Sequence, residues 1–167
     1  IDNFMQAADA PAAKMSIELA DVKEFIDEIK PKSVLDIGCG DGRLYPHLKE
    51  WGVESYKGTD ISENLIKAAQ FRFPHEKDNF EAVKVEDLNE SEKKDLVFSY
   101  TTLEHIKEED FPKAVEAIKK SGKQLLLIEP TGFISRFYCH NNAYRTHFKV
   151  IKSKKLKDKE IMLCNLE

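Results

Sequence analysis

Three glycines within five residues mark the segment of this sequence best suited to chemistry. Gly38, Gly40 and Gly42 follow the short apolar run 34–37 and precede a segment with helical spacing. Closely spaced glycines allow positive φ angles and let a ligand approach the main chain. Asp36 stands two residues before the first glycine. We expect its carboxylate in a pocket, where it would suit an ammonium or sulfonium group better than a pyrophosphate.

The elements around this turn alternate between strand and helix. Hydrophobic periodicity and capping signals predict helices over 12–30, 41–49, 62–71 and 109–120, and strands over 34–37, 55–59, 80–85, 96–98, 125–128, 148–151 and 161–164. Such alternation favours right-handed crossovers and a parallel sheet. The predicted fold is α/β: a doubly wound, mostly parallel seven-stranded sheet with helices on both faces and a C-terminal antiparallel hairpin. Ligands of such sheets bind beyond the carboxyl ends of the strands, where the glycine turn lies.

Length and composition narrow the classes of protein. The 167 residues fit one domain, which we expect over 12–167 after a loose lead-in at 1–11. The balance of 26 basic and 30 acidic residues gives a net charge of −4 and disfavours a nucleic-acid partner. The longest apolar runs, such as 125–128, have four residues and are far shorter than the roughly 20 residues of a membrane-spanning helix. Three scattered cysteines predict no disulfide scaffold and a cytoplasmic location. Because the sequence begins with Ile1, fusion to another domain stays open.

The segment Val34 to Leu44 resembles the first motif of class I S-adenosylmethionine-dependent methyltransferases, and weaker resemblances follow in order over 15–164. The resemblance implies an enzyme that binds S-adenosylmethionine and releases S-adenosylhomocysteine. Asp60, 22 residues after Gly38, resembles the acid that holds the ribose hydroxyls. Asp87, with Glu86 as the fallback, resembles the acid that meets the adenine amino group. The implied cofactor-binding residues are Asp36, Gly38, Cys39, Gly40, Asp60, Ile61, Glu86, Asp87, Leu88, Ser99 and Tyr100.

The acceptor side is expected on the segments that follow the predicted fourth and fifth strands. His105 and His140 are the candidate general bases, and the candidate substrate-binding residues are Glu104, Tyr138, Tyr144, Arg145 and His147. No metal is expected, because the sequence lacks an H-x-x-H pair or paired acids. Few residues are available to cap the site, so we expect an open site for a polar small molecule or a sugar/phosphate-type acceptor, methylated on oxygen or nitrogen. The lysine-rich stretch 152–159 is interpreted as a solvated hairpin rather than a contact for an anionic substrate.

Three alternatives compete with this interpretation. A tight strand-to-helix turn without a ligand would also use glycines, and a non-catalytic methyltransferase-like module would bind only the cofactor or a partner. A dinucleotide-dependent oxidoreductase is disfavoured because Arg43 stands where the G-x-G-x-x-G fingerprint requires its third glycine. Methylation of DNA bases is disfavoured because Ser99-Tyr100-Thr101-Thr102 stands where such enzymes carry Asn-Pro-Pro-Tyr.

Overall fold

A computed structural model describes residues 12–131 and 143–167, with side chains from residue 18 in the first range and from residue 144 in the second. Contacts divide the chain into two units, Ile1–Lys30 and Pro31–Glu167. The first unit contributes helix α2 (Ala12–Ile29), which stops before Pro31 as predicted. The expected lead-in at 1–11 lies outside the described residues, and the single domain over 12–167 stays a prediction. No helix within the described ranges is long and apolar enough to cross a membrane.

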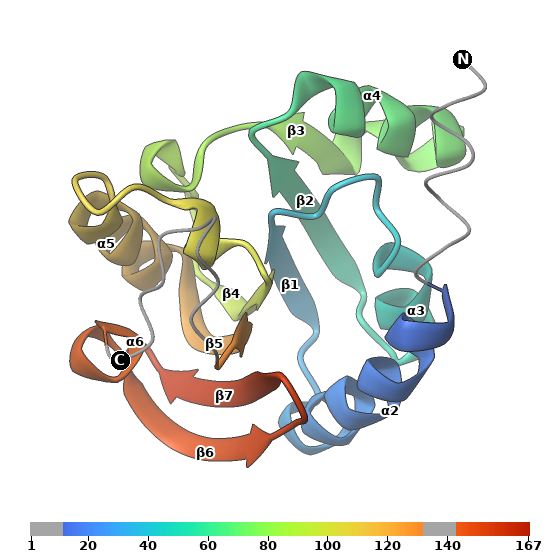
Figure 1. Ribbon diagram of the computed structural model, residues 1–167. Coiled ribbons are helices and arrows are strands. Elements are labelled where there is room, and N and C mark those ends of the chain that lie inside the picture. The colour runs from blue at the N-terminus through green and yellow to red at the C-terminus, as the bar shows by residue number, and fades with distance from the viewer. Residues whose placement is uncertain (1–11, 132–142) are drawn as a thin grey trace. The chain divides into compact units, whose positions relative to one another are not determined.

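The second unit is built on one seven-stranded sheet (Figure 1). Its strands are β1 (Ser33–Ile37), β2 (Ser55–Asp60), β3 (Phe80–Ala82), β4 (Lys94–Tyr100), β5 (Gly122–Pro130), β6 (Lys149–Lys155) and β7 (Lys159–Asn165). They lie in the order β3-β2-β1-β4-β5-β7-β6. The first five strands pair in parallel, whereas β7 pairs antiparallel with both β5 and β6. The predicted doubly wound sheet with a terminal hairpin is confirmed.

The central strands are apolar because both of their faces are covered. Val34, Leu35 and Ile37 of β1 are fully buried, as are 96–98 of β4 and 125–128 of β5. Helix α4 (Glu63–Arg72) contacts β2 and β3, and helix α5 (Phe111–Ser121) contacts β4 and β5 (Figure 1). This burial makes the sheet a rigid base, so the loops at its carboxyl ends start from fixed positions.

The helix after the glycine turn begins later than predicted. Helix α3 spans Tyr45–Glu50, and Asp41, the first residue of the predicted helix, lies in the turn that precedes it. The Asp41 carboxylate instead forms ion pairs with Arg43 at 3.1 Å and with Arg72 at 3.3 Å. Positive φ at Gly42 (+77°) keeps the preceding residues out of the helix. Arg43, which falls within the helix predicted over 41–49, therefore also lies in the turn.

Elsewhere in the chain, one predicted strand is shorter than expected, one predicted helix cap is confirmed and one helix was not predicted. The strand predicted over 80–85 ends at Ala82, and a short 3-10 turn follows at Val85–Asp87. Ser62 caps α4 as predicted, because its side chain accepts a hydrogen bond from the Leu65 N–H at 3.3 Å. A short helix, α6 (Ala143–His147), precedes β6 and was not predicted.

Candidate active site

The glycine turn is held against the end of β2 by main-chain hydrogen bonds. The N–H groups of Gly38 and Cys39 both donate to the carbonyl of Thr59, at 2.7 and 2.9 Å. Gly38 has φ of +71°, and a Cβ added there would lie 2.0 Å from Oγ1 of Thr102. Gly40 has φ of +57°, but a Cβ there would meet no atom within 4 Å. Gly38 is therefore required by close packing, whereas the space beside Gly40 is open to a ligand.

Asp60 ties this turn to the start of α4. Its Oδ2 accepts a hydrogen bond from the Gly40 N–H at 3.0 Å, and its Oδ1 accepts one from the Ser62 N–H at 2.8 Å. An ionised carboxylate offers about four acceptor positions. Each oxygen therefore keeps the capacity to accept a further hydrogen bond from a ligand.

A pocket of about 520 Å³ opens at this point. It lies beyond the carboxyl ends of β1, β2 and β4, and it spans the place between β1 and β4 where the strand order reverses. Its lining residues are Gly38, Gly40, Asp60, Ile61, Leu65, Val83, Lys84, Val85, Glu86, Tyr100, Thr101, Thr102, His105, Ile106, Lys107 and Asp110. A volume of this size is typical of small-molecule sites, which occupy roughly 300–1,000 Å³.

One wall of the pocket is the loop that leaves β4, and Glu129 holds this loop in place. Thr101 has a φ of +48°, which is uncommon for a residue with a side chain. Oε1 of Glu129 accepts hydrogen bonds from the N–H groups of Thr102 at 3.1 Å and Leu103 at 2.9 Å. Glu129 is buried, and burial raises its pKa to about 8, against the opposing effect of the backbone hydrogen bonds. Its Oε2 has no hydrogen-bond partner among the described residues.

Six of the predicted cofactor-binding residues meet at this pocket. They are Gly38, Gly40, Asp60, Ile61, Glu86 and Tyr100. Of the two acids considered for the adenine contact, the fallback Glu86 lines the pocket, whereas Asp87 is exposed and does not. Both acids lie on the short 3-10 turn Val85–Asp87, where consecutive side chains point in different directions, so that only Glu86 joins the pocket lining.

The other predicted cofactor-binding residues are outside the pocket lining. Asp36 is 1% exposed and accepts a hydrogen bond from the Tyr56 hydroxyl at 2.8 Å. Burial raises the pKa of Asp36 to about 7. Burial, together with the charges of Asp36 and Asp60, raises the pKa of the Cys39 thiol well above its usual range, so it stays protonated. Two more predicted cofactor-binding residues do not line the pocket. Ser99 is fully buried, and Leu88 packs against the core.

The predicted catalytic and substrate-binding residues separate into three groups. His105 lines the pocket and its side chain is half exposed, with Nε2 3.7 Å from Oε1 of Glu104. Glu104 is buried, which raises the pKa of its carboxyl against the opposing effect of His105 and Lys159. Tyr144, Arg145 and His147 lie on α6, away from this pocket lining. Tyr138 and His140 lie outside the described residues.

Sequence reasoning missed the residues that shape the wall of the pocket. Glu129, Thr101 and Thr102 were not proposed, although a glutamate directly after the apolar run 125–128 is an unusual end for a buried strand. Lys159 was also missed, and its Nζ donates to the Tyr100 hydroxyl at 2.9 Å. No local spacing links these residues, because they come from three separate strand ends.

The family assignment rests on a comparison with known proteins. The profile described as a methyltransferase domain matches residues 34–124, more than half of the chain. The chain therefore belongs to this methyltransferase domain family. The match includes the glycine turn, Asp60 and the segment around Glu86, so the class predicted from the sequence, the S-adenosylmethionine-dependent methyltransferases, is confirmed.

The curated relatives include O-methyltransferases and an N-methyltransferase. The mitochondrial ubiquinone biosynthesis O-methyltransferase of Candida albicans is 35% identical over 105 residues, which cover 57% of this chain and 31% of that protein. Phosphoethanolamine N-methyltransferase 2 of Caenorhabditis elegans is 30% identical over 119 residues, covering 67% of this chain and 27% of that protein. The chain thus spans about a third of the length of these relatives.

Solved structures share the fold at low sequence identity. The PH0226 protein of Pyrococcus horikoshii has a TM-score of 0.76 at 16% identity, with 92% of this chain and 90% of that one covered. Magnesium protoporphyrin IX methyltransferase of Synechocystis, solved with bound S-adenosylmethionine, has a TM-score of 0.69 at 22% identity, with coverage of 89% and 77%. These likenesses show the fold alone.

Proposed function

We propose that this chain transfers a methyl group from S-adenosylmethionine to an oxygen or nitrogen of a polar small molecule or a sugar/phosphate-type acceptor. The observation that carries the proposal is the pocket at the point of strand-order reversal, where Asp60 and the Gly38–Gly40 turn meet. Membership of the methyltransferase domain family supports it.

The lining of the pocket fits a nucleoside cofactor. The space beside Gly40 lets a ligand approach the main chain, and the Asp60 carboxylate can accept from ribose hydroxyls. Glu86 would accept from the adenine amino group, and Ile61, which is 69% exposed, offers apolar surface to the ring. When bound, the cofactor supplies a methyl group on a positively charged sulfur. The role of the protein is then to orient the two reactants, and orientation is a large part of such catalysis.

His105 is the proposed proton acceptor at the pocket mouth. It combines exposure to a substrate with a place in the lining, and its Nε2 lies 3.7 Å from Oε1 of the buried Glu104. A hydroxyl group of the acceptor would give up its proton to His105 as its oxygen takes the methyl group. A neutral amine would take the methyl group with its lone pair and then give up an N–H proton to His105. In both cases the carbon–sulfur bond breaks and S-adenosylhomocysteine leaves. The names of the relatives support both acceptor atoms, because one is an O-methyltransferase and the other an N-methyltransferase.

The test combines binding with turnover. Calorimetric titration with S-adenosylhomocysteine measures occupation of the pocket, and transfer of a radiolabelled methyl group measures activity against a panel of hydroxyl and amine acceptors. We expect saturable binding and turnover of at least one polar acceptor. Binding without turnover on any acceptor would favour the non-catalytic module, and absence of binding at millimolar concentration would refute the proposal.

A further inference from the structure

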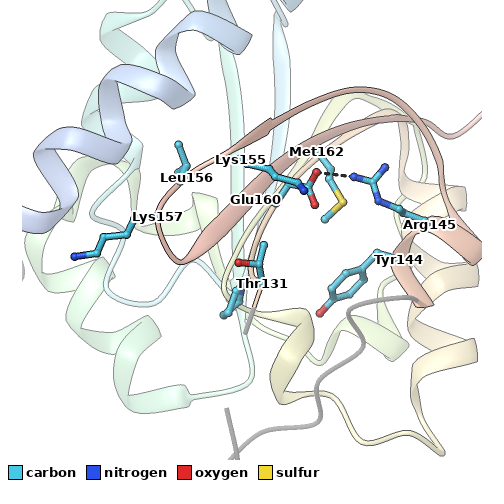
Figure 2. Close-up of a pocket in the computed structure, with 9 residues that line it drawn as sticks. Thr131, Tyr144, Arg145, Lys155, Leu156, Lys157, Glu160 and Met162 are labelled. Carbon is cyan, nitrogen blue, oxygen red and sulfur yellow. Dashed lines mark hydrogen bonds and ion pairs between the residues drawn. The ribbon is translucent and has the colours of Figure 1, made fainter. Parts of the chain in front are cut away.

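A second pocket, of about 470 Å³, lies beside the antiparallel strands and α6 (Figure 2). Its polar lining consists of Thr131, Tyr144, Arg145, Lys155, Lys157 and Glu160. We propose that this pocket binds the phosphate group of the methyl acceptor, so that the acceptor is a small phosphate monoester. The inference rests on the proposed function, because it assigns the substrate class of the same enzyme.

The charge of this region is opposite to that of the rest of the chain. Residues 145–159 contain seven of the 26 basic residues and one of the 30 acidic residues, a formal charge of +6 in a chain of net −4. The acidic residue in this segment is Asp158, and the carboxylate in the pocket lining is Glu160. A concave site with charge of one sign concentrates ligands of the opposite sign.

Arg145 is positioned for anion binding by its ion pair with Glu160. The Nη2 atom of Arg145 lies 2.5 Å from Oε1 of Glu160, and Figure 2 shows the guanidinium turned toward this carboxylate. A guanidinium has five N–H donors, so one bond to Glu160 leaves donors for a second anion. In the described ranges no carboxylate lies within ion-pair distance of Lys155 or Lys157, although Lys155 stands opposite Glu160 in the β6–β7 ladder and Figure 2 shows the Lys157 side chain pointing away from Arg145. The pocket therefore holds more positive than negative charge.

The two pockets are linked at the carboxyl ends of β4 and β5. Pro130, at the end of β5, lines the second pocket and pairs with Lys159 in the β5–β7 ladder. Lys159 donates to the hydroxyl of Tyr100, and its Nζ lies 4.6 Å from the centre of the Tyr100 ring. Tyr100, at the end of β4, lines the cofactor pocket. A small molecule anchored by its phosphate in the second pocket would thus extend toward the cofactor pocket past Tyr100.

The test is calorimetric titration of the full chain with inorganic phosphate and with glycerol 3-phosphate. Glycerol and acetate are the uncharged and carboxylate comparisons, while phosphatidylglycerol vesicles and a 12-nucleotide single strand test a membrane surface and a nucleic acid. We expect saturable binding of both phosphate probes that weakens as salt is added. Binding only to acetate, vesicles or the oligonucleotide, or to none of the probes, would overturn the assignment.

Variants make the assignment specific to this pocket. Lys155→Gln should weaken phosphate binding about threefold, as expected for an exposed ion pair, and adding Lys157→Gln should weaken it further. Glu160→Gln should strengthen binding, since it removes the carboxylate that competes for Arg145. Lys149→Gln is the matched control, because Lys149 is an exposed lysine of the same strand outside the pocket lining. Equal effects of Lys149→Gln and Lys155→Gln would contradict the proposal.

Failure of this inference is separable from failure of the proposed function. A chain that binds S-adenosylhomocysteine but no phosphate probe keeps its cofactor site and loses only the substrate class. A chain that binds phosphate but not S-adenosylhomocysteine has the anion pocket without the proposed enzyme.

Discussion

Asp60→Asn tests whether the carboxylate at the end of β2 binds the cofactor. In the wild-type chain, the two carboxylate oxygens accept from the N–H groups of Gly40 and Ser62. The amide keeps one oxygen acceptor but removes the charge. A hydrogen bond to a charged group contributes about 1.5–3 kcal/mol, and one between neutral groups about 0.5–1.5 kcal/mol. The difference between the middle values of these ranges is about 1.3 kcal/mol for one ribose contact, or roughly eightfold in Kd.

The assay is calorimetric titration with S-adenosylhomocysteine, with urea unfolding of the same sample to confirm that it is folded. Ser62→Ala is the matched control. It removes the cap on Leu65 and should lower the free energy of unfolding by about 1 kcal/mol, but it keeps the main-chain bond to Asp60. Its affinity for the ligand should therefore equal that of the wild type. A folded Asp60→Asn variant with unchanged affinity would remove Asp60 from the site.

The remaining predictions concern the turn, the buried acids and the base. Gly38→Ala should lower the free energy of unfolding more than Gly40→Ala, because only the former clashes with a neighbouring side chain while both add a Cβ at positive φ; urea unfolding measures the difference. Burial raises the pKa of Glu129 to about 8 and that of Asp36 to about 7, so the folded state binds more protons than the unfolded state between about pH 4.5 and 8. The free energy of unfolding should accordingly decrease as pH rises through this window. Urea unfolding at stepped pH measures this decrease, which should be smaller in Glu129→Gln than in the wild type. An equal dependence on pH in the wild type and in Glu129→Gln would refute the prediction. His105→Gln should lower turnover by about 100-fold, which is at the lower end of general-base effects. Its affinity for S-adenosylhomocysteine, measured by calorimetry, should stay unchanged. Full turnover by this variant would exclude His105 as the base.

The architecture was predictable because its signals are local and repeated. The apolar runs 34–37, 96–98 and 125–128 are the buried strands, and each ends close to its predicted boundary. The glycine turn was predictable for the same reason, since positive φ at three nearby positions favours glycine strongly. The parallel order followed from the alternation of strands and helices.

The contacts that shape the site depend on the folded chain and could not be read from spacing. The Glu129 carboxylate reaches main-chain N–H groups 26 and 27 residues away, and Lys159 meets Tyr100 from 59 residues away. The choice between Glu86 and Asp87 depended on a 3-10 turn, which has no strong sequence signal. Burial decided the environment of Asp36, because its carboxyl is enclosed with Tyr56 rather than facing the pocket lining.

The central claim is that the pocket beside the glycine turn binds S-adenosylmethionine. The most direct measurement is titration of the ¹⁵N-labelled chain with S-adenosylhomocysteine, followed through the backbone amide resonances. We predict saturable shifts concentrated at Gly38, Gly40, Asp60 and Thr101, which line the pocket. Shifts confined to residues outside this lining, or no shifts at millimolar ligand, would contradict the account.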